Sequence, residues 1–440
     1  MKLQGLKLKG FDEIAALLLS LCFFTLFLLG KKGIIADFAL IGLIVSAIYA
    51  LVNIEIFLVF VTYAAAIKGT YLNVLPKSID MTLLFFAFLV LGLMLHIAFN
   101  KRKFPSIYLF DGVVLFLAIS VIVAFLNTSS KSYTYGLEKF LRFFIVVLPF
   151  FYIPRLFDDK DLKKLIHFFA FFGAVFCLAI FLYYEDYRAL KEAGQHYLPV
   201  AKMAGISFIF NIYLFLNEKG FFKKLFFLSL TLVSLLMLFK ANSRGAILFS
   251  FFVLLIYSWY ILKDKKIYFI VLAATVVISI LVVFTVSPDS FRRFFMLFGR
   301  HKGLSVSIRM VLYKIALKLI SKYWFTGIGL GGFARYHYLK YPHNLFLEFF
   351  VECGLLGFLS ITLFLGYLTF CAVRLIKITR LENEYTPFIL SFLFVELYHM
   401  TSFSMIHLRW LMVFAGFVFM FYIRVKERVK HSQEIKDLKV

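Results

Sequence analysis

One strongly apolar stretch, YPHNLFLEFFVECGLLGF (Tyr341–Phe358), contains polar side chains that could do chemistry. Asn344, Glu348 and Glu352 are spaced by four residues, so on a helix they form one polar stripe descending from its start. Glu352 then lies about 13 Å below that start, at about 1.5 Å per residue. A helix that only crosses a bilayer carries no such groups, so the acids indicate either function or pairing with a cation from another helix.

His343 is the candidate general base, because an unperturbed histidine titrates near working pH. We expect Pro342 in the first turn of the helix and His343 at the outer membrane–water boundary. A lone histidine at a membrane surface is usually structural, but the outward-facing arginines predicted nearby make His343 a better candidate for a general base. Asn344, Glu348 and Glu352 are candidate accessory residues, and for the two glutamates we favour a bracing role.

Arg244, in KANSRGAILF, is the first of two candidate anion-binding arginines. It follows a short Asn-Ser turn and opens an apolar run on the predicted outer side. A helix N-terminus there presents free N–H groups. The guanidinium adds further N–H donors, arranged as a fork that matches two phosphate oxygens. Taken alone, Arg244 reads as an interfacial arginine whose head reaches the surface, which is common.

Arg309 lies in a stretch with helical periodicity, Ser305–Trp324. Lys314, Lys318 and Lys322 repeat every four residues and form one basic stripe. At about 100° per residue, Arg309 lies about 140° from that stripe, on the apolar side. An arginine there is costly without an anionic partner, so it either forms a structural pair or points into a site.

A glycine-rich segment, FTGIGLGGF (Phe325–Phe333), follows that helix. It lacks the Gly-Lys-Ser/Thr ending and the preceding strand of a nucleotide-binding loop. We interpret it as a turn-rich hinge that lets the backbone approach another group closely. Arg335, His337 and Arg409 are further candidate accessory residues, Arg409 at the edge of the last outer loop.

These candidates must be positioned by membrane helices. The 440-residue chain is 62% hydrophobic with 60 phenylalanines and 16% charged residues, which excludes a large soluble helical protein. The four cysteines lie singly in apolar runs, which predicts small buried residues rather than disulfides or a metal site. The first apolar run reads as an uncleaved span. We therefore predict an all-α integral membrane protein of about 12 to 14 transmembrane helices, with spans at 11–30, 34–51, 54–69, 81–99, 107–126, 138–154, 165–184, 202–217, 225–239, 245–262, 267–286, 344–366, 386–403 and 408–423.

Basic clusters fall in every second loop, which places those loops and both termini in the cytoplasm. The same pattern explains much of the net charge of +24 without nucleic acid. The outward loop Ser287–Pro342 is an exception, with ten Lys/Arg against one acid, Asp289. A concave basic surface there would attract a phosphate or diphosphate headgroup, although general contact with acidic lipid would explain the charge too. We expect a single polytopic domain over residues 1–440, with this large loop at 287–342 containing amphipathic helices.

The order Ser-Arg-Gly, Arg309 in a basic outer loop, TGIGLGGF and then HNLFLEFFVECGLLG resembles the bacterial O-antigen ligase and polymerase superfamily, most of all its ligases. The resemblance covers about residues 230–365, and the N-terminal spans match in hydropathy only. It implies a metal-independent, inverting glycosyltransferase without a cofactor in the bacterial inner membrane. The enzyme would act at the periplasmic face and transfer O-antigen glycan from undecaprenyl diphosphate to lipid A-core. Arg244 and Arg309 would hold the diphosphate, and His343 would deprotonate the acceptor hydroxyl.

Two alternatives stay open at this stage. A repeat-unit polymerase or a protein O-oligosaccharyltransferase of the same superfamily would use the same donor with another acceptor. A lipid-linked glycan flippase would also explain many spans and basic charge. Transporters tend to show pseudo-repeats and broken helices near the midplane, whereas here the unusual residues gather around one outer loop.

Overall fold

The structure is a computed structural model that describes residues 53–71, 81–99, 105–183, 197–261 and 304–437, with isolated positions between 270 and 285. Every element within these ranges is a helix, which confirms the all-α prediction for this part of the chain. The predicted spans at 11–30 and 34–51 lie outside the described residues, as does most of 267–286.

Four of the described helices are long and apolar enough to cross a membrane: α8 (Asp159–Tyr183), α10 (Tyr197–Asn217), α11 (Phe221–Lys240) and α16 (Leu345–Thr379). A fifth candidate is the pair Asp111–Leu126 and Ser130–Leu156, whose two parts are bent by 114°. Apolar parts of α3 (Ile54–Tyr71), α4 (Met81–Ala98) and α12 (Arg244–Ile261) are shorter. The chain is thus a multi-pass membrane protein, with four to five candidate spans in its described part. The total of about 12 to 14 spans for the whole chain stays a prediction.

The described residues fall into two compact units. The first contains α3, α4, α8, α10 and α11. In it, α10 packs against both α8 and α11 and is buried along nearly its whole length. Ser207 of α10 bonds the Ser234 hydroxyl at 2.9 Å, and Asn211 donates to the Ala170 carbonyl at 3.0 Å. Polar side chains thus join three of its helices, as is common between membrane helices.

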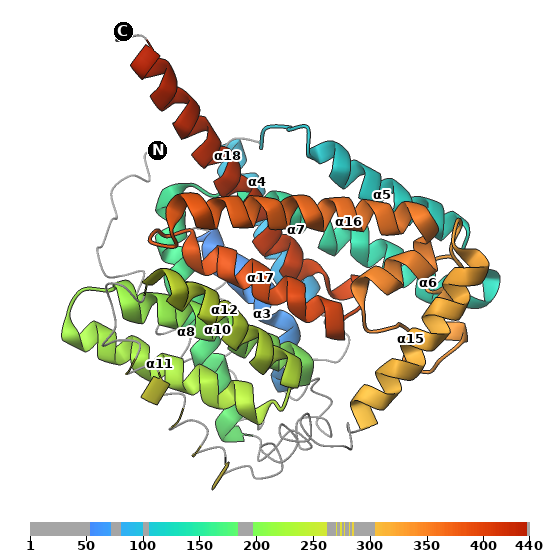
Figure 1. Cartoon of the computed structure of the whole chain (residues 1–440), viewed down its shortest axis with the longest axis horizontal. Coiled ribbons are helices and arrows are strands. Elements are labelled where there is room, and N and C mark those ends of the chain that lie inside the picture. The colour runs from blue at the N-terminus through green and yellow to red at the C-terminus, as the bar shows by residue number, and fades with distance from the viewer. Residues whose placement is uncertain are drawn as a thin grey trace. The chain divides into compact units, whose positions relative to one another are not determined.

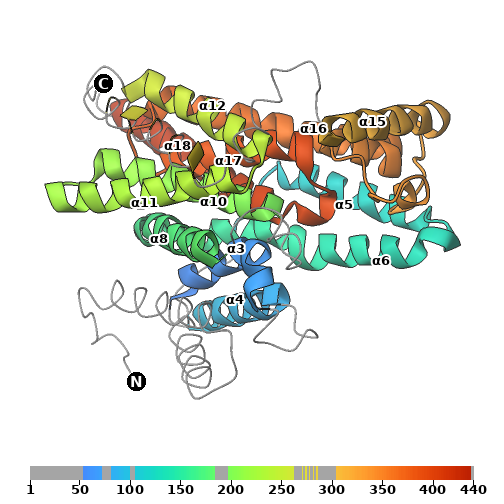
Figure 2. The same cartoon turned by 90° about the horizontal axis from the view of Figure 1, so that it is seen from below.

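The second unit contains the predicted site residues. Its helices are α5 (Asp111–Leu126), α6 (Tyr133–Arg142), α7 (Pro149–Tyr152), α12, α15 (Leu304–Tyr323), α16, α17 (Thr386–Ser402) and α18 (Arg409–Asp437), with short helical turns η1 (Ser130–Ser132), η2 (Phe143–Val147), η3 (Ile153–Leu156), η4 (Gly332–Arg335) and η5 (Met405–His407). Figure 1 shows α16 and α17 side by side and α15 against the N-terminal part of α16, and Figure 2 shows the same α15–α16 contact from below.

The predicted span at 138–154 lies within one helical stretch, Ser130–Leu156. Along it the hydrogen-bonding pattern changes from α-helical in α6 to the π-helical turn η2, then to α7 and the 3-10 turn η3. Pro149 and Pro154 both lie in this stretch, and a proline removes a backbone donor and clashes with the preceding turn. Hydropathy alone cannot detect such a change of hydrogen-bonding pattern, because the composition stays apolar throughout.

α16 is broken at Gly354, whose φ of 64° and ψ of −156° are not helical. The Leu355 N–H donates to the Phe325 carbonyl at 3.2 Å, and the Ile328 N–H donates to the Val351 carbonyl at 2.9 Å. The glycine-rich segment 325–333 therefore supplies hydrogen bonds that the helix loses at its break. The close backbone approach predicted for this segment is confirmed, and its partner is the interrupted α16.

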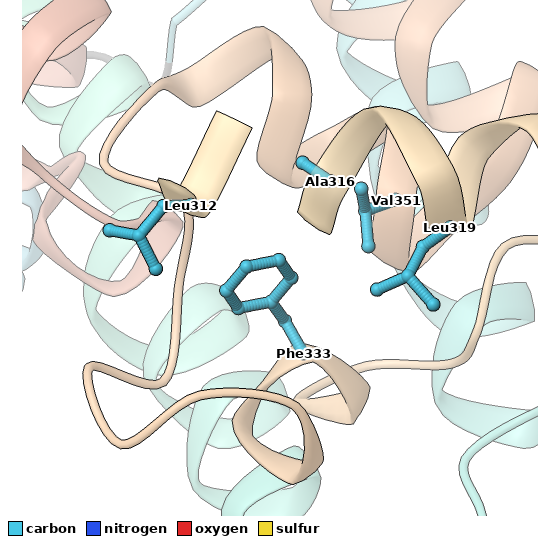
Figure 3. Close-up of a cluster of buried hydrophobic side chains, with 5 residues drawn as sticks. All are labelled: Leu312, Ala316, Leu319, Phe333 and Val351. Carbon is cyan, nitrogen blue, oxygen red and sulfur yellow. The ribbon is translucent and has the colours of Figure 1, made fainter. Parts of the chain in front are cut away.

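The same segment places Phe333 in an apolar core. Figure 3 shows the Phe333 ring directed at side chains from α15 and α16, namely Leu312, Ala316, Leu319 and Val351, all of which are buried. This core fixes α15 against the first part of α16. It also confirms which face of α15 is apolar, since Lys314, Lys318 and Lys322 on the opposite face are exposed.

Gly354→Ala is expected to destabilise the protein by about 1–3 kcal/mol, because an alanine at positive φ is strained. A Cβ at this position would also collide with the Phe325 carbonyl oxygen. Gly366→Ala, in a regular part of α16 with nothing within 4 Å of its Cβ position, is the matched control and should be neutral or slightly stabilising. Melting temperatures of the two purified variants test this. Equal melting temperatures would contradict the assigned break.

Candidate functional site

His343 lies just before α16, in a left-handed conformation with φ of 59°. Its Nδ1 is 3.2 Å from the carbonyl oxygen of Ser402, at the end of α17. Because a carbonyl can only accept a hydrogen bond, Nδ1 carries a proton, and in the neutral ring Nε2 carries the basic lone pair. The ring of Tyr341 lies 4.3 Å from the imidazole ring, centroid to centroid.

The start of α16 differs from the prediction. Its first residue is Leu345 and its N-cap is Asn344, whose Oδ1 accepts from the Leu347 N–H at 3.0 Å. Pro342 therefore lies before the helix and not in its first turn, because the left-handed His343 turns the chain between them. Asn344 also donates from Nδ2 to the Met400 carbonyl at 2.9 Å, which ties the start of α16 to the last turn of α17.

Arg309 reaches the same end of α17. Its Nη2 lies 3.4 Å from Ser402 Oγ, so Ser402 contacts Arg309 through its hydroxyl and His343 through its carbonyl. Tyr313, one turn further along α15, belongs to this group. Burial raises the pKa of the Tyr313 phenol, while the charge of Arg309 and a hydrogen bond with Asn344 act against the rise.

Arg244 is the first residue of α12, as predicted, and the turn before it has Asn242 at a φ of 56°. α12 packs on α17. A Cβ placed on Gly245 would lie 3.3 Å from Thr401 Oγ1, which itself is 3.3 Å from Ser402 Oγ. Two of the predicted site residues, Arg309 and His343, thus meet at the last turn of α17, and the start of α12, which bears Arg244, packs beside them.

Glu348 and Glu352 pair with a cation that the sequence did not reveal, Lys139 of α6. Lys139 Nζ lies 2.7 Å from Glu348 Oε1 and 2.8 Å from both carboxylate oxygens of Glu352, and all three side chains are 0% exposed. We call these three residues the buried ion triad. The polar stripe predicted for α16 is therefore present. Of the two alternatives for its glutamates, function or pairing with a cation from another helix, the structure shows the pairing.

The buried ion triad also holds backbone segments near the site. The Ser404 hydroxyl and the Met405 N–H donate to Glu348, at 2.5 and 2.9 Å. The Gly331 N–H donates to Glu352 at 2.9 Å. The two glutamates thereby join the loop after α17 and the glycine-rich segment to the part of α16 that follows His343. The sequence alone did not single out Lys139, because Arg142 is a second cation in the same apolar run, 138–154.

The remaining candidates lie on flanking segments. Arg335 is exposed in η4 and donates from Nη1 to Ser129 Oγ at 3.0 Å. His337 Nδ1 accepts from the Leu339 N–H at 3.2 Å. Arg409 begins α18 and is 7% exposed.

The sequence also predicted small buried cysteines rather than disulfides or a metal site. Among the described residues, no three or more His, Cys, Asp or Glu side chains are arranged to hold a metal ion. Cys177, Cys353 and Cys371 are free and buried, as predicted, whereas Cys22 lies outside the described part of the chain.

Comparison with known proteins addresses the family directly. No curated protein and no solved structure matches the chain. A family model described as O-antigen ligase matches residues 229–362, a segment that begins within α11 and ends within α16. It contains Arg244, Arg309 and His343, so the predicted resemblance is confirmed over the stretch that contains these candidate residues. Residues 229–362 of this multi-pass membrane protein are therefore similar to the O-antigen ligase family.

Proposed function

We propose that the protein is an inverting, metal-independent glycosyltransferase that moves O-antigen glycan from undecaprenyl diphosphate to lipid A-core at the periplasmic face of the inner membrane. The single observation that supports this best is the meeting of Arg309 and His343 at Ser402. The start of α12, with Arg244, packs beside it. A cationic group and a basic nitrogen at one place suit a reaction with an anionic leaving group and an alcohol nucleophile.

The arginines would bind the donor diphosphate. A guanidinium presents parallel N–H donors that match two phosphate oxygens, and the N-terminus of α12 adds backbone N–H groups beside Arg244. Negative charge grows on the bridging oxygen as the bond from the anomeric carbon to the diphosphate breaks. Fixed cations that face this oxygen stabilise the transition state more than the ground state.

His343 would act on the acceptor. Its Nδ1–H is engaged with the Ser402 carbonyl, which fixes the ring, and Nε2 would take the proton of the acceptor hydroxyl. The acceptor oxygen then bonds to the anomeric carbon from the face opposite the diphosphate. Undecaprenyl diphosphate leaves with the bond electrons, and the configuration at the anomeric carbon inverts.

A turnover assay tests this function. The purified protein, lipid-diphosphate glycan and lipid A-core should together yield free undecaprenyl diphosphate and glycosylated lipid A-core. Movement of the donor across vesicles without any new glycosidic bond would overturn the proposal in favour of a flippase. Cell-surface lipopolysaccharide distinguishes the related enzymes: loss of a ligase leaves bare core, whereas loss of a polymerase leaves core plus one unit.

Arg309→Gln and Arg244→Gln are each expected to lower kcat/KM by about 10²–10³-fold, the loss typical of removing one donor that stabilises a developing oxyanion. Lysine at either position should recover part of the rate, because it restores the charge but not the fork. Lys318→Gln is the matched control, since it removes one positive charge from the exposed face of α15. An equal loss in all three variants would indicate a general charge effect and contradict the assigned roles.

A further inference from the structure

Two segments of the second unit form a surface beside the site. Arg335 donates to Ser129 Oγ at 3.0 Å, and Lys340 Nζ lies 5.2 Å from the centroid of the Tyr135 ring. η1 and η4 also pack together. Residues 129–135 and 335–341 therefore lie side by side, and both belong to loops predicted to face outward.

This surface is rich in exposed tyrosine and in positive charge. Tyr133, Tyr336 and Tyr338 are 50%, 41% and 72% exposed. Exposed cations accompany them, and the two segments, SSKSYTY and RYHYLKY, contain no acid. We call it the tyrosine–cation surface and define it by the six exposed side chains Lys131, Tyr133, Arg335, Tyr336, Tyr338 and Lys340.

Tyrosine and arginine carry much of the binding energy at recognition surfaces. A tyrosine offers a large flat face and a hydroxyl while losing few rotatable bonds on binding. Here the Arg335 guanidinium lies 5.8 Å from the centroid of the Tyr336 ring, a cation–π distance that restrains both side chains. Ring faces suit the C–H faces of sugar rings, and adjacent cations suit phosphate or carboxylate groups on those sugars.

The tyrosine–cation surface is continuous with the candidate base. Its second segment runs directly into His343, and the intervening Tyr341 ring lies 4.3 Å from the imidazole ring. Lys340 and His343 both have positive φ, 63° and 59°, so the chain makes two fixed turns between the surface and the site. A sugar chain bound on the surface would have one end close to His343.

We propose that the tyrosine–cation surface binds the acceptor as an anionic oligosaccharide, stacking its sugar rings on the tyrosines and pairing its phosphate or carboxylate groups with Arg335 and Lys340. This rests on the proposed function and adds the part of the protein that selects the acceptor. The donor diphosphate is bound elsewhere, by Arg244 and Arg309. The surface therefore governs the KM for the acceptor and leaves the KM for the donor unchanged.

The test uses the full chain in nanodiscs of neutral lipid, with lipid-free core oligosaccharide as the binding probe. Tyr338→Ala and the double variant Arg335→Gln/Lys340→Gln should each bind the probe at least about tenfold more weakly than the wild type, as expected for removal of anchor residues. The acceptor KM should rise by a similar factor with the donor KM unchanged. Lys314→Gln/Lys318→Gln, which removes the same charge from the exposed face of α15, should bind the probe like the wild type.

Three outcomes separate the possibilities. Probe binding by the double variant as tight as that of the wild type would overturn the proposal. The proposal would also be overturned if the double variant kept its binding of the probe but lost binding to anionic lipid nanodiscs, because the surface would then be a membrane contact. Wild-type protein that binds the probe without any glycan transfer would support the surface and contradict the proposed function.

Discussion

His343→Asn is expected to lower glycan transfer by about 10²–10⁴-fold, the contribution of a positioned general base. Asparagine tolerates the left-handed backbone that His343 adopts, with φ of 59°, better than most residues. It has no basic nitrogen. The variant therefore removes the proton acceptor while leaving the backbone unstrained, which His343→Ala does not.

Single-turnover transfer with saturating donor measures this loss without a contribution from product release. Binding of undecaprenyl diphosphate should persist in His343→Asn, since the arginines are intact. Tyr341→Phe is the matched control: it keeps the ring against His343 and should stay within a few-fold of the wild type. Transfer by His343→Asn at the wild-type rate would exclude His343 as the base.

Lys139→Met is expected to destabilise the protein by about 3–5 kcal/mol, the cost of leaving buried charge without its partner. Glu348 and Glu352 are 0% exposed and both bond Lys139 Nζ, so the variant buries two carboxylates without their cation. Loss of transfer should follow, because the glutamates also hold Ser404, Met405 and Gly331.

The triple variant Lys139→Met/Glu348→Gln/Glu352→Gln separates charge from shape. It removes every charge of the buried ion triad and keeps side chains of similar length, so it should regain much of the stability lost in Lys139→Met. Melting temperature and yield of monodisperse protein are the measurements. A Lys139→Met protein as stable as the wild type would show that the triad carries little stability.

Several features of the site were predictable because they depend on local periodicity. The apolar face of α15 follows from spacing along one helix, so the opposite positions of Arg309 and Lys318 could be read from the sequence. The start of α12 at Arg244 likewise follows from the Asn-Ser turn before it. The four-residue spacing of Glu348 and Glu352 placed both on one side of α16, where they are found.

Other features depend on contacts between distant residues. The partner of Glu348 lies 209 residues earlier in the chain, and nothing in α16 itself identifies it. The break at Gly354 cannot be predicted from the sequence, because a glycine in an apolar run looks the same whether it interrupts a helix or lets another helix pack closely. Pro342 was placed inside the helix, since the left-handed turn at His343 is a conformation that sequence rules assign to glycine first.

The buried ion triad also bears on how the protein is made. Translation at about 5–20 residues per second separates Lys139 from Glu348 by roughly 10–40 s, given the 209 residues between them. During that interval α6 carries a lysine that is destined for burial but has no carboxylate to receive it. Helix α6 therefore reaches its final position only after α16 has been synthesised. The helices of the second unit assemble late, around the N-terminal end of α16.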